Sequence, residues 1–176
     1  MLSASCSTVY QVVKYDDRGT YLTTGCPAGC GPGDLRLWLW KFSSSTLVKI
    51  SERHCFGWVI QNQIAWGTTF EGTSPSYLLR LDLTSGQESN WLTTTDAVIG
   101  LDGEGLVLLS HYGPPNALSR VTAPQTTEQL ISGPYFTAVI SDGSRTWLGP
   151  GIYLYTNAAG VQRVSDFNGT PLGPLS

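Results

Sequence analysis

The chain has little charge and no long hydrophobic run. Only 13% of its 176 residues are Asp, Glu, Lys or Arg, about half the roughly 25% of an average globular protein. Lys and Arg total 10 and are scattered, so no basic stripe is present to neutralise nucleic-acid phosphates. No apolar run approaches the ~18 residues that a membrane helix needs. We therefore expect neither a nucleic-acid partner nor a membrane span.

Motifs for catalysis and for metal binding are also missing. The two histidines, His54 and His111, lie in no catalytic motif. The nucleophile elbow, the phosphate loop, the His-Glu-x-x-His zinc motif and the Asp-x-Asp-x-Asp-Gly calcium loop do not occur. We therefore expect no catalytic residue, no metal and no cofactor, and the role is more in keeping with binding than with an enzyme.

The sequence does contain a repeated pattern of four short apolar stretches separated by polar turns. Each repeat opens with a hairpin, and two openings carry Asp102-Gly103 and Asp142-Gly143 at the same point. Asp-Gly between apolar runs predicts a two-residue type I′ turn, because that turn needs positive φ. The four openings are 12–22, 58–66, 97–107 and 138–148.

Each repeat then continues with a third and a fourth strand. The third strands are expected at 35–42, 77–83, 117–121 and 152–155. The fourth strands end in an aliphatic residue followed by a hydroxyl residue, with the aliphatic residue at positions 50, 92, 131 and 164, hence 42, 39 and 33 residues apart. The stretch 35–42 alternates Leu with Trp and predicts a strand buried on both faces. Most tryptophans in strands are expected in the core: Trp38, Trp40, Trp58, Trp66 and Trp147.

Four strands in a period of about 40 residues resemble the blades of β-propeller repeat proteins. The resemblance covers Val9 to Phe167 and is to the class, since the Gly-His and Trp-Asp pairs of WD-repeat blades and the double glycine of kelch blades are absent. The hemopexin-like family is similar in blade count, but it joins its first and last blades by a disulfide, and no cysteine follows Cys55. We predict an all-β, single-domain chain with four four-stranded blades at about 8–51, 56–93, 96–132 and 135–167, and a tail at 168–176. A β-sandwich or barrel is the alternative.

Four blades can form a closed ring or half of a larger ring. An open ring exposes apolar blade faces and strand edges, which must be covered. Strand-like sequence begins soon after Met1 without the charged region of a signal peptide. We favour the partial ring, which predicts a homodimer or a continuation into a longer chain.

The four cysteines, Cys6, Cys26, Cys30 and Cys55, all lie in the first repeat. An even number in a weakly charged chain rich in Ser and Thr is typical of disulfides in an oxidising compartment. We favour the pairs Cys26–Cys30 and Cys6–Cys55, with free thiols or a zinc site as the alternatives. This predicts an extracytoplasmic or secreted protein.

Aromatic residues, 11% of the chain, are the best indication of a binding role. Several are expected at strand ends or in loops, where an apolar ring with a polar neighbourhood suits recognition of a protein or a carbohydrate. The leading hypothesis is a non-enzymatic binding or scaffold module, and the alternatives are a fragment of a propeller hydrolase or lyase and a structural part of a larger propeller. The candidate binding residues are Phe70, Trp91, His111, Tyr112 and Tyr135.

Overall fold

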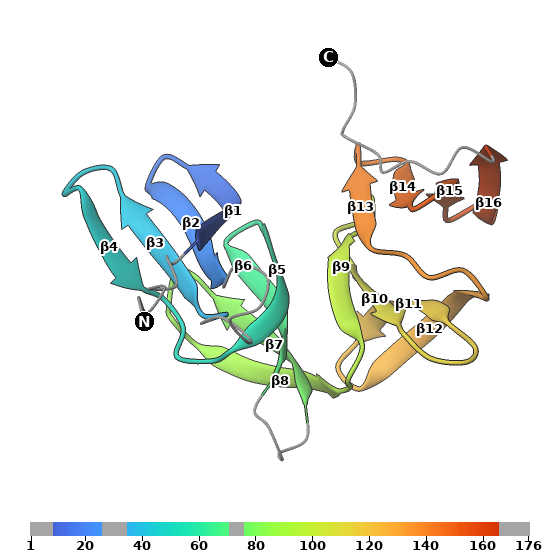
Figure 1. Ribbon diagram of the computed structural model, residues 1–176, viewed down its shortest axis with the longest axis horizontal. Helices are drawn as coiled ribbons and strands as arrows, with labels where there is room; N and C mark the ends of the chain where they lie inside the picture. The colour runs from blue at the N-terminus through green and yellow to red at the C-terminus, as the bar shows by residue number, and fades with distance from the viewer. Residues whose placement is uncertain (1–8, 26–34, 71–75, 166–176) are drawn as a thin grey trace, which may run out of the picture.

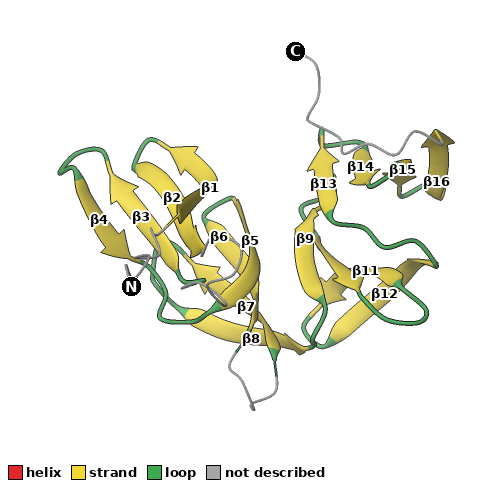
Figure 2. Cartoon of the chain, viewed as in Figure 1, coloured by secondary structure: helices red, strands yellow, loops and turns green. Residues whose placement is uncertain are grey.

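Sixteen β-strands make up the computed structural model, which describes residues 9–25, 35–70 and 76–165 (Figure 1). Figure 2 shows strands joined by turns and loops, with no helix in the described ranges, and hence none that could cross a membrane. The strands are β1 (Val9–Asp16), β2 (Gly19–Gly25), β3 (Leu37–Lys41), β4 (Thr46–Lys49), β5 (Cys55–Gln61), β6 (Ile64–Thr69), β7 (Tyr77–Asp82), β8 (Glu88–Thr93), β9 (Ala97–Leu101), β10 (Val107–His111), β11 (Ala117–Ala123), β12 (Thr126–Ser132), β13 (Ala138–Ser141), β14 (Thr146–Gly149), β15 (Ile152–Thr156) and β16 (Gly160–Ser165).

The strands form four separate antiparallel sheets of four consecutive strands each, β1–β4, β5–β8, β9–β12 and β13–β16. We call these sheets blades 1 to 4. The first strand of each blade is innermost, with β5 beside β9 and β9 beside β13, while the other strands fan outwards (Figure 1). Four such blades around common inner strands confirm the predicted propeller architecture.

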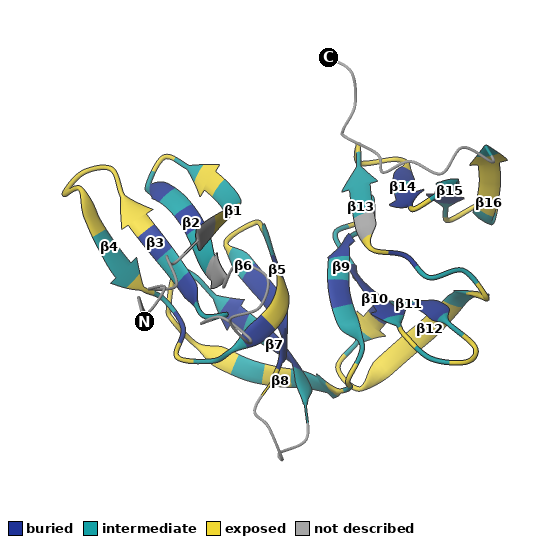
Figure 3. Cartoon of the chain, viewed as in Figure 1, coloured by how far each residue is buried: buried dark blue, intermediate teal, exposed yellow. Residues whose placement is uncertain are grey.

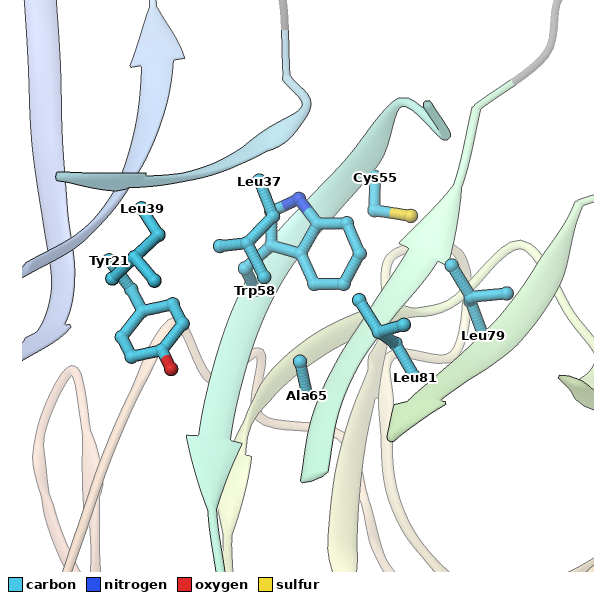
Figure 4. Close-up of a cluster of buried hydrophobic side chains, with 8 residues drawn as sticks. All are labelled: Tyr21, Leu37, Leu39, Cys55, Trp58, Ala65, Leu79 and Leu81. Atoms are coloured by element: carbon cyan, nitrogen blue, oxygen red, sulfur yellow. The ribbon is translucent and has the colours of Figure 1, made fainter. Parts of the chain in front are cut away.

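The core consists of three apolar layers, each between two successive blades. Blades 1 and 2 enclose Tyr21, Leu37, Leu39, Cys55, Trp58, Ala65, Leu79 and Leu81 (Figure 4). The second layer contains Trp66 and Leu109 from blades 2 and 3, and the third contains Leu108 and Tyr155 from blades 3 and 4. Burial is accordingly greatest between the blades and least at the outer strands (Figure 3). Each blade is therefore stabilised mainly by its neighbours.

The structure corrects the prediction for 35–42. Strand β3 alternates, with Leu37 and Leu39 buried against blade 2, whereas Trp38 is half-buried and Trp40 is 41% exposed. Trp147 is also only half-buried, whereas Trp58 and Trp66 belong to the core as predicted. The strand thus buries one face, because no described blade packs on the other.

The predicted type I′ turns at the two Asp-Gly pairs are wrong. Leu101 pairs with Val107 and Ser141 with Thr146, so these hairpin loops have five and four residues. The two-residue turn with positive φ at both central positions is Asn62-Gln63, with φ of 48° and 64°. In the longer loops, Asp102 and Asp142 instead accept backbone hydrogen bonds through their side chains. An Asp side chain can mimic a backbone turn in this way, so Asp suits these longer loops as well as a two-residue turn.

Two hairpin turns are expected to weaken in acid. Backbone N–H groups of Ser85 and Thr84 lower the pKa of Asp82, and those of Arg145 and Ser144 lower the pKa of Asp142. Because the pKa of each carboxyl is lower in the folded state, the ionised carboxylate stabilises the fold at pH values above its ordinary pKa of 3.8. This stabilisation is lost as the pH falls from 3.8 through the lowered pKa. We expect the melting temperature to fall from pH 5 to pH 2, and the gap between wild type and Asp82→Asn to narrow over that range in thermal melts. A gap that does not change with pH would contradict the role of the carboxylate.

Candidate functional site

One edge of blades 2 and 3 gathers the connections that follow the second and the fourth strands. In blade 3, Ser110 pairs with Ala97 and Ala117 with Ser132, so the end of β10 lies beside the start of β9. In blade 2, Cys55 pairs with Thr69 in the same way. The Thr68 hydroxyl donates to the Asp96 carbonyl over 2.6 Å and joins the two blades at this edge. We call this edge the loop face.

Two aromatic pairs lie on the loop face. The rings of Phe56 and Phe70 are 4.9 Å apart in blade 2, and those of Tyr112 and Tyr135 are 5.2 Å apart beside blade 3. Phe56, Phe70 and Tyr112 are 41%, 45% and 80% exposed, whereas Tyr135 is half-buried. Tilted and edge-on packing at such distances is favourable and restricts the rings. The loop face therefore presents apolar rings that are held in place.

A polar pair lies beside Tyr112. His111 ends β10, and its Nδ1 is 2.7 Å from Oδ1 of Asp96, the residue before β9. The side chains are 46% and 23% exposed. A carboxylate at Nδ1 fixes the orientation of the imidazole ring and leaves its other nitrogen for a ligand. The pair thus provides an oriented polar group next to the tyrosines.

The loop that carries Tyr112 is preorganised around an open cavity of about 390 Å³. Asn116 holds this loop: its Oδ1 accepts from the Gly113 N–H, and its Nδ2 donates to the Gly133 carbonyl, both over 3.2 Å. A surface fixed in this way loses less entropy on binding. The lining residues are Tyr112, Gly113, Pro114, Pro115, Asn116 and Gly133.

The structure brings together three of the five candidate residues, His111, Tyr112 and Tyr135, and places Phe70 on the same edge. Trp91 lies elsewhere, within strand β8, where its ring packs edge-on at 4.8 Å against Trp66. Arg80 covers both indole rings. The contacts of Trp91 are therefore those of the layer between blades 2 and 3.

A second cavity, of ≈ 360 Å³, lies between the innermost strands. Its walls combine apolar and polar side chains. The apolar ones include Val13 from β1, Trp58 and Ile60 from β5, Ile99 from β9 and Val139 from β13, and the polar ones are Gln61, Asp102 and Ser141. In the described ranges, no three His, Cys, Asp or Glu side chains are grouped so as to hold a metal ion. This groove therefore offers a mixed polar and apolar surface, and the described residues form no group there that could bind a metal ion.

Of the four cysteines, only Cys55 belongs to the described residues. It is buried, 1% exposed, in the layer between blades 1 and 2. Cys6, Cys26 and Cys30 lie outside the described residues. Both disulfide pairs stay predictions.

Sequence inspection missed Phe56 and Asp96. Phe56 was assigned to no strand, and Asp96 precedes one. The position of Asp96 could have been predicted from the hairpin. In an antiparallel hairpin, the residue before the first strand lies beside the end of the second strand. Applied to β9 and β10, that rule places Asp96 next to His111.

Comparison with known proteins supports the fold. No family model matches the chain, and no curated protein matches its sequence. Among solved structures, the chain is similar to the tricorn protease, with 14% identity, a TM-score of 0.64 and coverage of 94% of this chain and 19% of that one. It is also similar to a chain of the nidogen/laminin complex, with 11% identity, a TM-score of 0.58 and coverage of 83% of this chain and 59% of that one. For an oligogalacturonate lyase the identity is 13%, the TM-score 0.57 and the coverage 86% of this chain and 51% of that one.

These neighbours are propeller-type proteins, so the chain has a β-propeller fold. At sequence identities of 11–14%, these similarities show the fold and nothing about function. The chain spans between a fifth and three fifths of the length of these neighbours. The same fold supports unrelated functions, so function must be argued from the loop face.

Proposed function

We propose that the chain is a non-enzymatic binding module whose loop face docks a protein partner. The observation that carries the proposal is the exposure of Phe56, Phe70 and Tyr112 on one edge of two adjacent blades. Aromatic residues are enriched at protein interfaces and dominate their binding energy. The Phe56–Phe70 pair has no polar end to match sugar hydroxyls, which favours a protein over a carbohydrate.

The test uses random peptides displayed on phage, selected on the wild-type chain. We expect enriched peptides to bind at least about tenfold more weakly to Tyr112→Ala and Phe70→Ala, since a hot-spot aromatic contributes about 2 kcal/mol or more. Phe42→Ala is the matched control, because Phe42 is 54% exposed at the end of β3, away from the loop face. Affinities are measured by biolayer interferometry on synthetic peptides.

Three results would contradict a protein-docking loop face. They are no enrichment, enriched peptides that bind Tyr112→Ala and Phe70→Ala as tightly as wild type, and peptides lost only on Phe42→Ala. Binding on a glycan array that Tyr112→Ala abolishes would replace the protein partner by a carbohydrate. We also propose an extracytoplasmic location, where disulfides form. A thiol titration of the unfolded, non-reduced chain tests whether those disulfides are present.

One observation favours a second candidate, an enzyme fragment. The Asp96–His111 hydrogen bond is the arrangement that orients a general base. The solved neighbours include an oligogalacturonate lyase and a puromycin hydrolase. Turnover of oligogalacturonate or of a nitrophenyl ester that disappears in both His111→Ala and Asp96→Asn would favour this candidate over the binding module.

A further inference from the structure

The three layers between blades follow one rule. On the second strand of each blade, one side chain faces the next blade: Tyr21 in blade 1, Trp66 in blade 2 and Leu108 in blade 3. Each is at most 9% exposed, since the following blade covers it. We call this side of a blade its forward face and the opposite side its backward face.

Blade 4 has a forward face with the same kind of residues. Trp147 lies on β14 between Thr146 and Leu148, which are buried against blade 3, so its ring lies on the opposite side. The strand register aligns it with Ile140 and Leu154, in an apolar row across three strands. All three are half-buried, whereas Leu108, which faces blade 4, is 0% exposed. The row therefore resembles the forward faces of blades 1 to 3, but no described blade covers it.

Blade 1 has a matching backward face. The β1–β2 hairpin of blade 1 and the β5–β6 hairpin of blade 2 both have two-residue loops, so their strands can be aligned residue by residue. Trp40 pairs with Thr20 in blade 1, and Leu81 pairs with Ala65 in blade 2. Trp40 and Leu81 therefore occupy equivalent positions. Leu81 is 0% exposed because blade 1 covers it, whereas Trp40 is 41% exposed. Val12 on the same face is 60% exposed. The face has the position and chemistry of a blade-to-blade layer without the preceding blade.

The two faces do not cover each other within the chain. Blades 1 and 4 stand at the two ends of an open arc (Figure 1), and no apolar layer in the described ranges contains residues of both. Their exposure contrasts with the buried layers between successive blades (Figure 3). An uncovered sheet face of this kind marks an interaction surface.

We propose that two copies of the chain join end to end, blade 4 of each packing on blade 1 of the other, to close one eight-bladed ring. The forward face of blade 4 continues an interface that the chain already makes three times, and the surface that fits it is the backward face of blade 1. A contact between two different faces builds a ring when the rotation closes. Propellers typically have four to eight blades, so two copies reach the upper limit and three would exceed it. This inference is independent of the partner proposed for the loop face.

Light scattering on the purified chain tests the closed pair. We expect twice the 19.0 kDa of one chain. Trp40→Glu and Trp147→Glu should each give the mass of one chain, because each variant damages both junctions of the ring. Tyr112→Glu is the control and should keep the doubled mass, since Tyr112 is 80% exposed on the loop face and belongs to neither end.

Mixing the two variants gives the sharpest result. A Trp40→Glu chain and a Trp147→Glu chain retain one intact junction between them, so the mixture should recover the doubled mass that neither variant has alone. Circular dichroism verifies the β-sheet content of each variant, and Trp40→Gln or Trp147→Gln replaces a glutamate variant that does not fold.

Several outcomes would overturn the closed pair. They are a wild-type chain with the mass of one copy, open polymers of increasing mass, folded variants that do not pair on mixing, and a Trp147→Glu chain that still dimerises. The last result would mean a symmetric contact of blade 1 with blade 1.

Discussion

Replacing Gly57 by alanine is expected to lower the free energy of unfolding by about 2–5 kcal/mol, from backbone strain together with overpacking. Gly57 has a φ of +68°, and a Cβ atom there would lie 2.1 Å from the carbonyl oxygen of Val98. The obstacle is backbone of the neighbouring inner strand β9, which cannot rotate away as a side chain can. The variant should therefore separate β5 from β9, and urea denaturation measures the loss.

Gly86→Ala is the matched control for that experiment. Gly86 also has a positive φ, +74°, but a Cβ atom there would meet nothing within 4 Å. We expect a loss of only about 1 kcal/mol, from the left-handed conformation alone. Equal losses in the two variants would contradict the close approach of the inner strands at Gly57.

Replacing Arg120 by methionine is expected to cost about 3–5 kcal/mol, because it leaves a buried carboxylate without its cation. The Asp102 side chain is 1% exposed, and its Oδ2 atom lies 3.5 Å from Nη1 of Arg120. The second nitrogen, Nη2, is 2.7 Å from Glu128, while Nη1 donates to Asn157 of blade 4. Burial lowers the pKa of Arg120, but the hydrogen bond to Glu128 and the nearby negative charges raise it overall, so the guanidinium stays charged.

Arg145→Met is the control for Arg120→Met. Arg145 pairs with Asp142 at 3.0 Å, but its side chain is 56% exposed. An exposed ion pair contributes little to stability because water screens it, so chemical denaturation should separate the two variants clearly. The double variant Arg120→Met, Asp102→Asn should recover part of the loss, since no uncompensated buried charge remains. A double variant as unstable as Arg120→Met alone would mean that the lost packing, and not the charge, sets the cost.

The architecture could be predicted from the sequence because the repeat is visible in local patterns. Alternating apolar residues give strands, polar turns end them, and four strands in each repeat give a blade. The turn types could not be predicted in this way. At Asp102 and Asp142 the side chain satisfies several N–H groups of a longer loop, and this competes with the two-residue turn that Asp-Gly also favours.

Burial was predicted less well than strand position. Trp40 and Leu81 occupy equivalent positions and are both hydrophobic, yet one is 41% exposed and the other is buried. The difference lies in whether a blade stands in front of the strand, which depends on the place of the blade in the arc and not on the strand's own residues. For the same reason the sequence suggested Tyr112 and Tyr135 singly, but their contact depends on two loops that only the folded blade brings together.

The equivalence of Tyr21, Trp66, Leu108 and Trp147 has a consequence for how such chains can change in length. Since every blade offers one kind of surface to its successor and another to its predecessor, an extra repeat inserted between two blades meets compatible surfaces on both sides. Gain or loss of whole repeats is therefore the change that this architecture accommodates most readily, whereas the loss of part of a repeat removes the surface that two neighbours require.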